Sequence, residues 1–194
     1  MPHPTLFYVR HGQTDWNAEM RFQGRQDIAL NNLGRRQAKA NGKKLAKLIA
    51  QPERYLFVTS PLSRTIETME IIRAAMGLDP KGYRIDDRLI EASYGTLEGT
   101  TLQEFKLSDP IAHKSRKYSR WNFCPPEGES HAMVHQRIAE WHKSISKDTI
   151  VVGHGVVGRV LRFQLLGLDP QEAADFVFPQ DRVFVWDGSG EKQV

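Results

Sequence analysis

Short apolar runs alternate along the chain with longer stretches of helical periodicity, and this alternation constrains the fold more than any other feature. The runs carry β-branched and aromatic residues, which favour strands, and they lie at 5–9, 55–60, 83–90, 149–152 and 183–186. The helical stretches between them span 33–50, 61–76, 130–145 and 155–166. Because parallel strands need crossover connections, the pattern predicts a mostly parallel sheet with helices on both faces. We therefore expect an α/β fold of the three-layer α/β/α sandwich type.

Residues that begin or end helices support these boundaries. Asn32 is the expected N-cap of the helix at 33–50, because its side chain can accept a hydrogen bond from the first turn, and Pro52 ends the pattern. Pro61 is placed to open the second helix, and Gly77 follows its last turn.

The length of the chain and one irregular segment bear on domain organisation. With 194 residues, and roughly 150 residues per domain as a guide, we expect 1–194 to form a single domain. No internal repeat or low-complexity linker argues otherwise. The segment 101–129 fits the alternation poorly and is rich in Lys, Arg, Tyr, Trp and Pro. It is expected to be an insertion at one edge of the sheet, over the active site.

Composition and charge narrow the class of protein. There are 27 Lys and Arg residues against 23 Asp and Glu residues, which gives a formal net charge of +4. This excess suits an anionic small molecule as well as nucleic acid. Cys124 is the only cysteine, so an intrachain disulfide and a Cys-based zinc site are excluded. The residues 1–4 do not resemble a signal peptide, and no apolar run is long enough to span a membrane. We expect a soluble cytoplasmic protein that binds no membrane.

Reactive side chains follow four of the predicted strands. Arg10 and His11 follow the first strand, Arg64 comes shortly after the second, Glu91 ends the third and His154 follows the fourth. In open α/β sheets, ligands bind beyond the carboxyl ends of the strands. The predicted topology would therefore bring these five residues together at one edge of the sheet.

Two arginines and two histidines around one point would form a cage for a phosphate group. Guanidinium groups bind phosphate oxygens through paired N–H donors, and each charge-assisted bond contributes about 1.5–3 kcal/mol. A neutral imidazole can attack phosphorus and form a covalent intermediate. Glu91 could protonate the departing alkoxide and then deprotonate the attacking water. Because the arginines supply the positive charge, this chemistry requires no metal or other cofactor.

The sequence resembles the histidine phosphatase superfamily, which includes the phosphoglycerate mutases. Similar motifs follow one another in the same order along nearly the whole chain. They are Val9-Arg10-His11-Gly12-Gln13-Thr14-Asp15-Trp16-Asn17, Gln23-Gly24, Ser60-Pro61-Leu62-Ser63-Arg64-Thr65, Glu91 with Tyr94-Gly95, Pro125-Pro126-Glu127-Gly128-Glu129-Ser130, and Val152-Gly153-His154-Gly155.

The resemblance implies a role for each matching residue. His11 would be the phosphorylated nucleophile and Glu91 the proton donor. The phosphate ligands would be Arg10, Arg64 and His154. The remaining substrate-binding residues would be Asn17, Gln23, Gly24, Tyr94 and the backbone of Gly155.

Departures from the family pattern bear on the reaction. Mutases carry an arginine after the glutamate of the acid loop and a nearby lysine, whereas this chain has Ala92 and Leu102 there. Only Gly188–Val194 follows the last predicted strand, although mutases tend to carry a longer tail. Both features favour a phosphatase for a small phosphorylated metabolite over a cofactor-dependent mutase. A non-catalytic module that binds phosphoryl ligands is the third alternative, which the intact His11 disfavours. Leu97 replaces a frequent tryptophan, which we interpret as a change in the pocket wall.

Three further features have more than one interpretation. His131, His135 and His142 have the spacing of one helix face, but we favour solvated histidines over a metal site because further ligands are missing. The basic and aromatic run at 113–121 suits nucleic acid, yet a solvated surface is the better account. Our own hypothesis is that part of this run overhangs the pocket and selects the substrate. The candidates for that role are Arg116, Arg120 and Trp121.

Two glycines next to His154, Gly153 and Gly155, are expected to allow close approach of the backbone to a ligand. The sequence does not fix the oligomeric state, and a homo-oligomer remains an open alternative.

Overall fold

The computed structural model describes residues 4–194 and contains a six-stranded sheet with the strand order β3-β2-β4-β1-β5-β6. The expectation of no signal peptide depends in part on residues 1–3, which lie outside the described residues. The strands are β1 (Leu6–Arg10), β2 (Leu56–Thr59), β3 (Arg84–Ile85), β4 (Thr149–Gly153), β5 (Val183–Trp186) and β6 (Glu191–Gln193).

Strands β1 to β4 are parallel to one another, whereas β5 and β6 run antiparallel to their neighbours. Arg10 of β1 is paired with Gly153 of β4, and Thr59 of β2 is paired with Val152. The three central strands therefore end at the same level. This register places the residues that follow them at one edge of the sheet, as the sequence predicts.

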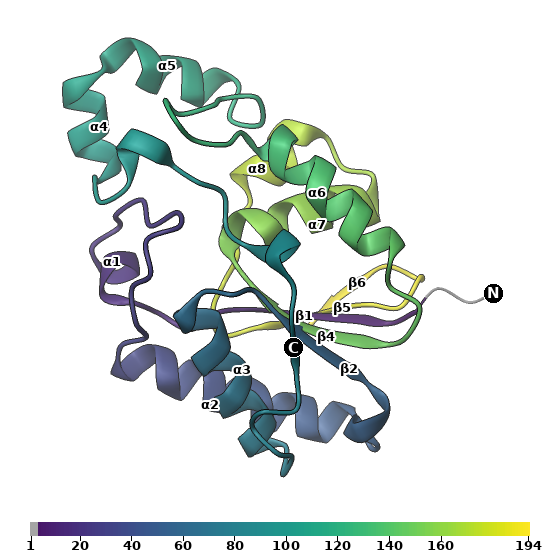
Figure 1. Ribbon diagram of the computed structural model, residues 1–194. Helices are drawn as coiled ribbons and strands as arrows, with labels where there is room; N and C mark the ends of the chain where they lie inside the picture. The colour runs from purple at the N-terminus through teal and green to yellow at the C-terminus, as the bar shows by residue number, and fades with distance from the viewer. Residues whose placement is uncertain (1–3) are drawn as a thin grey trace.

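Helices cover both faces of this sheet, which confirms the three-layer α/β/α sandwich (Figure 1). One face is covered by α2 (Asn32–Leu48) and α3 (Ser63–Ala75), and the other by α6 (His131–Lys143), α7 (Gly155–Leu166) and α8 (Pro170–Asp175). The alternation of side chains along β1 explains the two cores. Phe7 and Val9 pack in the core under α2 and α3, whereas Leu6 and Tyr8 pack in the core under the other helices.

The predicted boundaries need three corrections. Pro61 does not open the second helix, because α3 begins at Ser63 with Leu62 as its N-cap. The N-cap of α2 is Asn31 and not Asn32, because the side chain of Asn31 accepts the hydrogen bond from the N–H of Gly34. The third strand is much shorter than 83–90. Its pairing ends at Ile85 because the Asp86 side chain accepts a hydrogen bond from the N–H of Arg88 and begins the 3₁₀ turn Asp87–Leu89.

The segment 101–129 contains two helices, α4 (Leu102–Ser108) and α5 (Pro110–Tyr118), beyond the carboxyl end of the sheet (Figure 1). A reciprocal capping box between Thr101 and Glu104 begins α4, and the Asp109 side chain caps α5. The sequence reading also omits α1 (Asp15–Ala18), α8 and β6.

Among residues 4–194, no helix is long and apolar enough to cross a membrane.

Candidate active site

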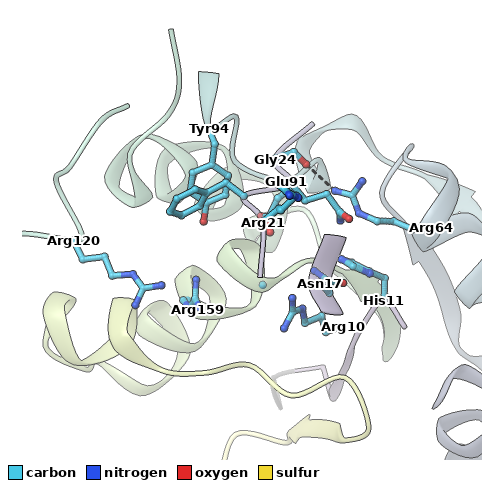
Figure 2. A pocket seen from close by; sticks show the side chains of 13 residues that line it. Arg10, His11, Asn17, Arg21, Gly24, Arg64, Glu91, Tyr94, Arg120 and Arg159 are labelled. Carbon is cyan, nitrogen blue, oxygen red and sulfur yellow. Dashed lines mark hydrogen bonds between the residues drawn. The ribbon is translucent and has the colours of Figure 1, made fainter. Parts of the chain in front are cut away.

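A cavity of about 120 Å³ opens at the carboxyl edge of the sheet (Figure 2). Every residue to which the resemblance assigns a role lines this cavity except His154, which lies beside His11 with the two ring centroids 5.2 Å apart. The lining residues are Arg10, His11, Asn17, Arg21, Phe22, Gln23, Gly24, Arg64, Glu91, Tyr94, Arg120, Gly155 and Arg159.

The His11 ring is held in one tautomer. Its Nδ1 lies 2.8 Å from the carbonyl oxygen of Gly12, which can only accept a hydrogen bond. Nδ1 therefore carries the proton, and Nε2 keeps its lone pair when the ring is neutral. The backbone N–H of His11 donates to the oxygen of Gly153 at 2.9 Å, which extends the pairing of β1 with β4 and fixes the residue in place.

The surroundings of His11 also keep its ring neutral. The side chain is only 2% exposed. Burial lowers the pKa of His11 well below its usual value, and the charges of Arg64 and Arg10 lower it further. An unprotonated imidazole beside two guanidinium groups is the form that can attack a phosphate.

His154 is the second buried histidine of the site. Its Nε2 lies 2.7 Å from Oγ of Ser60, and its Nδ1 has no hydrogen-bond partner among the described residues. Burial lowers the pKa of His154 well below its usual value, and Arg64 and His11 add to this effect. The unpartnered Nδ1 is a candidate contact for a bound oxyanion.

Arg10 and Arg64 are anchored by backbone carbonyl groups. Arg10 donates from Nη1 to the oxygen of Phe178 at 2.7 Å. Arg64 donates from Nη1 to Gln26 at 2.6 Å and from Nη2 to Gly24 at 2.7 Å, the contact drawn in Figure 2. The Nε atom of each arginine is buried without a partner. Each guanidinium group is thus fixed in place and still has N–H groups to offer to an oxyanion.

Glu91 is held by two backbone N–H groups. Its Oε1 accepts from Ala92 at 3.0 Å, and its Oε2 accepts from Val156 at 3.1 Å. Val156 belongs to the first turn of α7, and this helix begins directly after His154. The Glu91 carboxylate is therefore bound to the helix turn that follows the second histidine of the site. Glu91 itself lies beyond the short β3 and its 3₁₀ turn, which carry the chain to the cavity.

The loop that carries Asn17 and Gln23 is stabilised by its own polar groups. Thr14 caps α1 and donates from Oγ1 to Gln23 Oε1 at 2.5 Å. Gln180, which the sequence reading missed, donates from Nε2 to Asn17 Oδ1 at 2.9 Å and also contacts the oxygen of His11 at 3.1 Å. These contacts hold the pocket wall against the nucleophile.

The two glycines beside His154 have different roles. A Cβ atom on Gly153 would lie 2.4 Å from the hydroxyl of Tyr8, which donates to the oxygen of His154 at 2.6 Å. The prediction that Gly153 makes room for a ligand is therefore wrong, because the tyrosine occupies that space. A Cβ atom on Gly155 would lie 3.6 Å from Nε of Arg10, and this glycine does border the cavity.

The three candidates from the basic run also differ. Arg120 lines the cavity, whereas Arg116 lies 5.3 Å over the ring of Phe22 and lines a narrow crevice beside it. Trp121 is buried and packs against Phe163 with ring centroids 4.4 Å apart, so it cannot overhang the pocket. Arg120 therefore remains a candidate for selecting the substrate. Trp121 is excluded, because its apolar indole packs in the core.

The interpretation of the helix histidines as solvated is wrong for His131. That residue is only 6% exposed and packs near the ring of Trp121, as does His135. His142 shares a hydrogen bond of 2.9 Å with Gln164. No group of three or more potential metal ligands is found within the part of the chain that the structure describes.

Sequence reasoning missed three cavity residues, Arg21, Phe22 and Arg159, and Ser60 as the partner of His154. Arg159 carried a usable signal, since it is a lone cation between Val156-Val157 and Val160-Leu161 on a predicted apolar helix. The other residues lie in polar loops where no periodicity marks them.

Stability is expected to fall as the pH is lowered below about 6.5. The pKa values of His11, His131 and His154 are all lowered in the folded state, chiefly by burial. Below the ordinary histidine pKa, the unfolded chain therefore binds more protons than the folded chain. Each of these histidines then lowers the free energy of unfolding by up to about 1.4 kcal/mol for each pH unit. Urea unfolding at pH 7.5 and 5.5 measures this loss, and H131Q should show a smaller one. Equal stability of the native protein at both pH values would contradict three neutral buried histidines.

Two anchored arginines, a neutral histidine and a carboxylate at the carboxyl edge of an α/β sheet are the groups that phosphoryl transfer requires. Residues 6–193 match the model of the histidine phosphatase superfamily (branch 1), and the chain belongs to that superfamily. It is therefore an enzyme, as the motifs predicted, of a superfamily whose members include phosphatases and phosphoglycerate mutase-like proteins.

Similar proteins include both phosphatases and mutase-like proteins. Phosphoglycerate mutase-like protein 4 from Arabidopsis thaliana is 36% identical over 80% of this chain and 68% of its own length. Glucosyl-3-phosphoglycerate phosphatase from Mycolicibacterium vanbaalenii is 35% identical over 84% of this chain and 74% of its own length. The solved structure of mycobacterial glucosyl-3-phosphoglycerate phosphatase Rv2419c in complex with VO3 has a TM-score of 0.79 and 27% identity, and the match covers 98% of this chain and 97% of that one. The chain spans only 38% of the length of another relative, the bifunctional protein Rv2228c from Mycobacterium tuberculosis, which is 34% identical over 77% of this chain.

Proposed function

We propose that this protein hydrolyses phosphate monoesters of small metabolites without a metal, through a phosphohistidine intermediate on His11. The observation that carries the proposal is the geometry of His11, whose proton is held at Nδ1 while Nε2 stays free beside two anchored arginines. The cavity of about 120 Å³ is below the range of drug-sized ligand pockets, which favours a small substrate.

In the first step, Nε2 of His11 attacks phosphorus and the ester P–O bond breaks. Arg10 and Arg64 neutralise the charge on the equatorial oxygens, and the unpartnered Nδ1 of His154 contacts one of them. Glu91 acts as the general acid and gives a proton to the departing oxygen, which leaves as an alcohol.

In the second step, Glu91 takes a proton from water as the water attacks the phosphohistidine. The P–N bond breaks, its electron pair returns to Nε2, and inorganic phosphate leaves. The sum of both steps is hydrolysis of the ester. Each group ends as it began, which a catalyst requires.

The residues that replace two mutase cations favour a phosphatase over a mutase. Ala92 stands where a mutase has its arginine and carries no charge to hold a carboxylate. Leu102, which stands where a mutase has its lysine, does not line the cavity.

A substrate panel tests the proposed function against its alternatives. A phosphatase releases inorganic phosphate in proportion to substrate loss. A mutase converts 3-phosphoglycerate to 2-phosphoglycerate only with a bisphosphorylated primer, and a binding module does neither. Isomerisation without phosphate release, or binding without turnover on any ester, would overturn the proposal.

Replacing Glu91 with glutamine should slow the hydrolysis of alkyl phosphates by roughly 10²- to 10⁴-fold, the usual contribution of general acid catalysis. The effect on p-nitrophenyl phosphate should be far smaller in the first step, because its leaving group needs no proton. Single-turnover kinetics on both ester classes measure the difference. The variant E172Q, at an acid on α8, is the control. Equal losses for both classes would contradict this role of Glu91.

We also propose a cytoplasmic location, because Cys124 is exposed as a free thiol, which is typical of a reducing compartment. A small phosphorylated metabolite is the proposed partner, with neither nucleic acid nor membrane. Burial of Trp121 supports this, since it removes one aromatic platform from the basic run. A homo-oligomer would be detected by sedimentation.

A further inference from the structure

The cavity carries more positive charge than one phosphate group uses. Five of its lining residues are arginines, and two of them, Arg10 and Arg64, flank His11. The charge of Arg21 is compensated, because its guanidinium lies 2.6 Å from Glu19 and 3.3 Å from Glu104. The remaining two are Arg120 and Arg159.

These two guanidinium groups lack adequate partners. Arg159 donates from Nε to the oxygen of Phe176 at 2.6 Å and forms no ion pair with a described carboxylate. Arg120 lies 3.4 Å from Asp175, an acid whose side chain is 57% exposed and therefore well hydrated. The Nε atom of Arg120 is buried without any partner. Both residues thus keep N–H donors for another ligand.

The two groups also repel each other. Burial lowers the pKa of Arg159 to about 10, and the charge of Arg120 is the next largest cause. Such repulsion between two half-buried cations is unfavourable unless an anion neutralises it. Glu91 offsets part of this repulsion at Arg159, but no described acid forms an ion pair with that residue, so a bound anion would stabilise the pair further.

The pair lies next to the phosphate cage. Figure 2 shows Arg159 between Arg120 and Arg10, with Tyr94 above it. The charges of Arg120 and Arg10 both lower the pKa of Arg159, which agrees with its position between them. An anion on the pair would therefore lie in the same cavity as a phosphate on His11.

The wall behind Arg120 adds positive potential. Arg116 stacks over Phe22, and its pKa is lowered by burial and by Arg120. His131 lies in the same crevice and adds an unpartnered Nε2 but no charge, because burial lowers its pKa well below its usual value. The one acid in that crevice, Glu129, is already bound to Arg25 and Arg137.

We propose that Arg120 and Arg159 form a second anion subsite, and that the substrate is a small phosphate ester with a further carboxylate or phosphate group. The proposal rests on the proposed function for the scissile phosphate. It also explains how a chain with Ala92 and Leu102 in place of cations can hold a doubly anionic substrate. Guanidinium groups suit both kinds of anion, because each offers two parallel N–H bonds.

Matched substrate pairs test the subsite. 3-Phosphoglycerate and glycerol 3-phosphate differ at one carbon, where a carboxylate replaces a hydroxymethyl group. Propane-1,3-diol bisphosphate and its monophosphate give the corresponding pair for a second phosphate. We expect the native enzyme to prefer the doubly anionic member of at least one pair by about tenfold or more in kcat/KM. The better pair identifies the second group.

Variants assign this preference to the two arginines. R120Q and R159Q should each reduce the ratio of kcat/KM within the better pair by about tenfold, and R120K and R159K should retain part of it. R162Q is the matched control, since Arg162 lies on the same helix α7 but pairs with Glu191 at 2.9 Å. A ratio near one in the native enzyme, or a ratio that neither glutamine variant changes, would overturn the proposal.

The outcome is separable from the proposed function. If the native protein hydrolyses none of the esters, the phosphatase proposal fails. The preference within each pair can still be measured on H11A by calorimetry, as the ratio of the two dissociation constants. A preference for the doubly anionic ligand that R120Q and R159Q remove supports the subsite in that case. Equal binding of both members contradicts it.

Discussion

Replacing His11 with alanine is expected to lower kcat by on the order of 10⁴-fold or more, as removal of a covalent nucleophile does in other enzymes. The loss follows because Nε2 of this residue keeps its lone pair beside the two arginines, while Nδ1 donates to the oxygen of Gly12. Binding of inorganic phosphate should survive, since Arg10 and Arg64 are anchored by carbonyl groups elsewhere. Steady-state kinetics and calorimetry measure the two effects.

The control for this substitution is H113N, at a histidine on α5 that packs against Phe105 outside the cavity. It should retain native kcat. If H11A kept more than about a hundredth of the native kcat while it still bound phosphate, another residue would have to be the nucleophile.

Arg64 has the second large effect, and it acts on both binding and stability. R64A removes two charge-assisted bonds to phosphate, each worth about 1.5–3 kcal/mol. It also leaves the carbonyl groups of Gln26 and Gly24 without their donor, at about 1–3 kcal/mol each. The inhibition constant of phosphate should therefore rise by several orders of magnitude, and the urea midpoint should fall.

The lysine variant separates these two roles. R64K keeps the charge and loses the planar pair of donors, so phosphate inhibition should weaken by roughly 10- to 100-fold in a protein that still folds. R35K, at an exposed arginine paired with Glu67, should change neither quantity. An unchanged inhibition constant in folded R64K would contradict the cage.

The sheet and the cage could be predicted because their signals are local. The apolar runs before Arg10 and Gly153 mark buried strands, and parallel strands that end at one level bring the residues after them together. The predicted length of the third strand is wrong for a physical reason. The Asp86 side chain accepts a hydrogen bond from the backbone N–H of Arg88, which favours a turn over continued strand pairing. The Thr101 to Glu104 spacing was a capping-box signal for α4 that the reading overlooked.

Other parts of the site depend on tertiary packing. Trp121 turned inward because its indole finds Phe163, and Gly153 is required by the hydroxyl of Tyr8, a residue 145 positions away in the chain. No local pattern encodes such contacts. The approach of Arg120 to Arg159 likewise results from the packing of the insertion near α7 and α8, which the periodicity of either segment does not contain.

Rapid-quench labelling tests most directly whether turnover passes through His11. The enzyme is mixed with an ester that carries ³²P in its phosphate group and is quenched in base within one turnover, and the labelled peptide is identified by mass spectrometry. The account predicts a transient label on His11 that is stable in base and labile in acid, and that is absent from H11A. Turnover without any labelled protein, or a label on a different residue, would contradict the account.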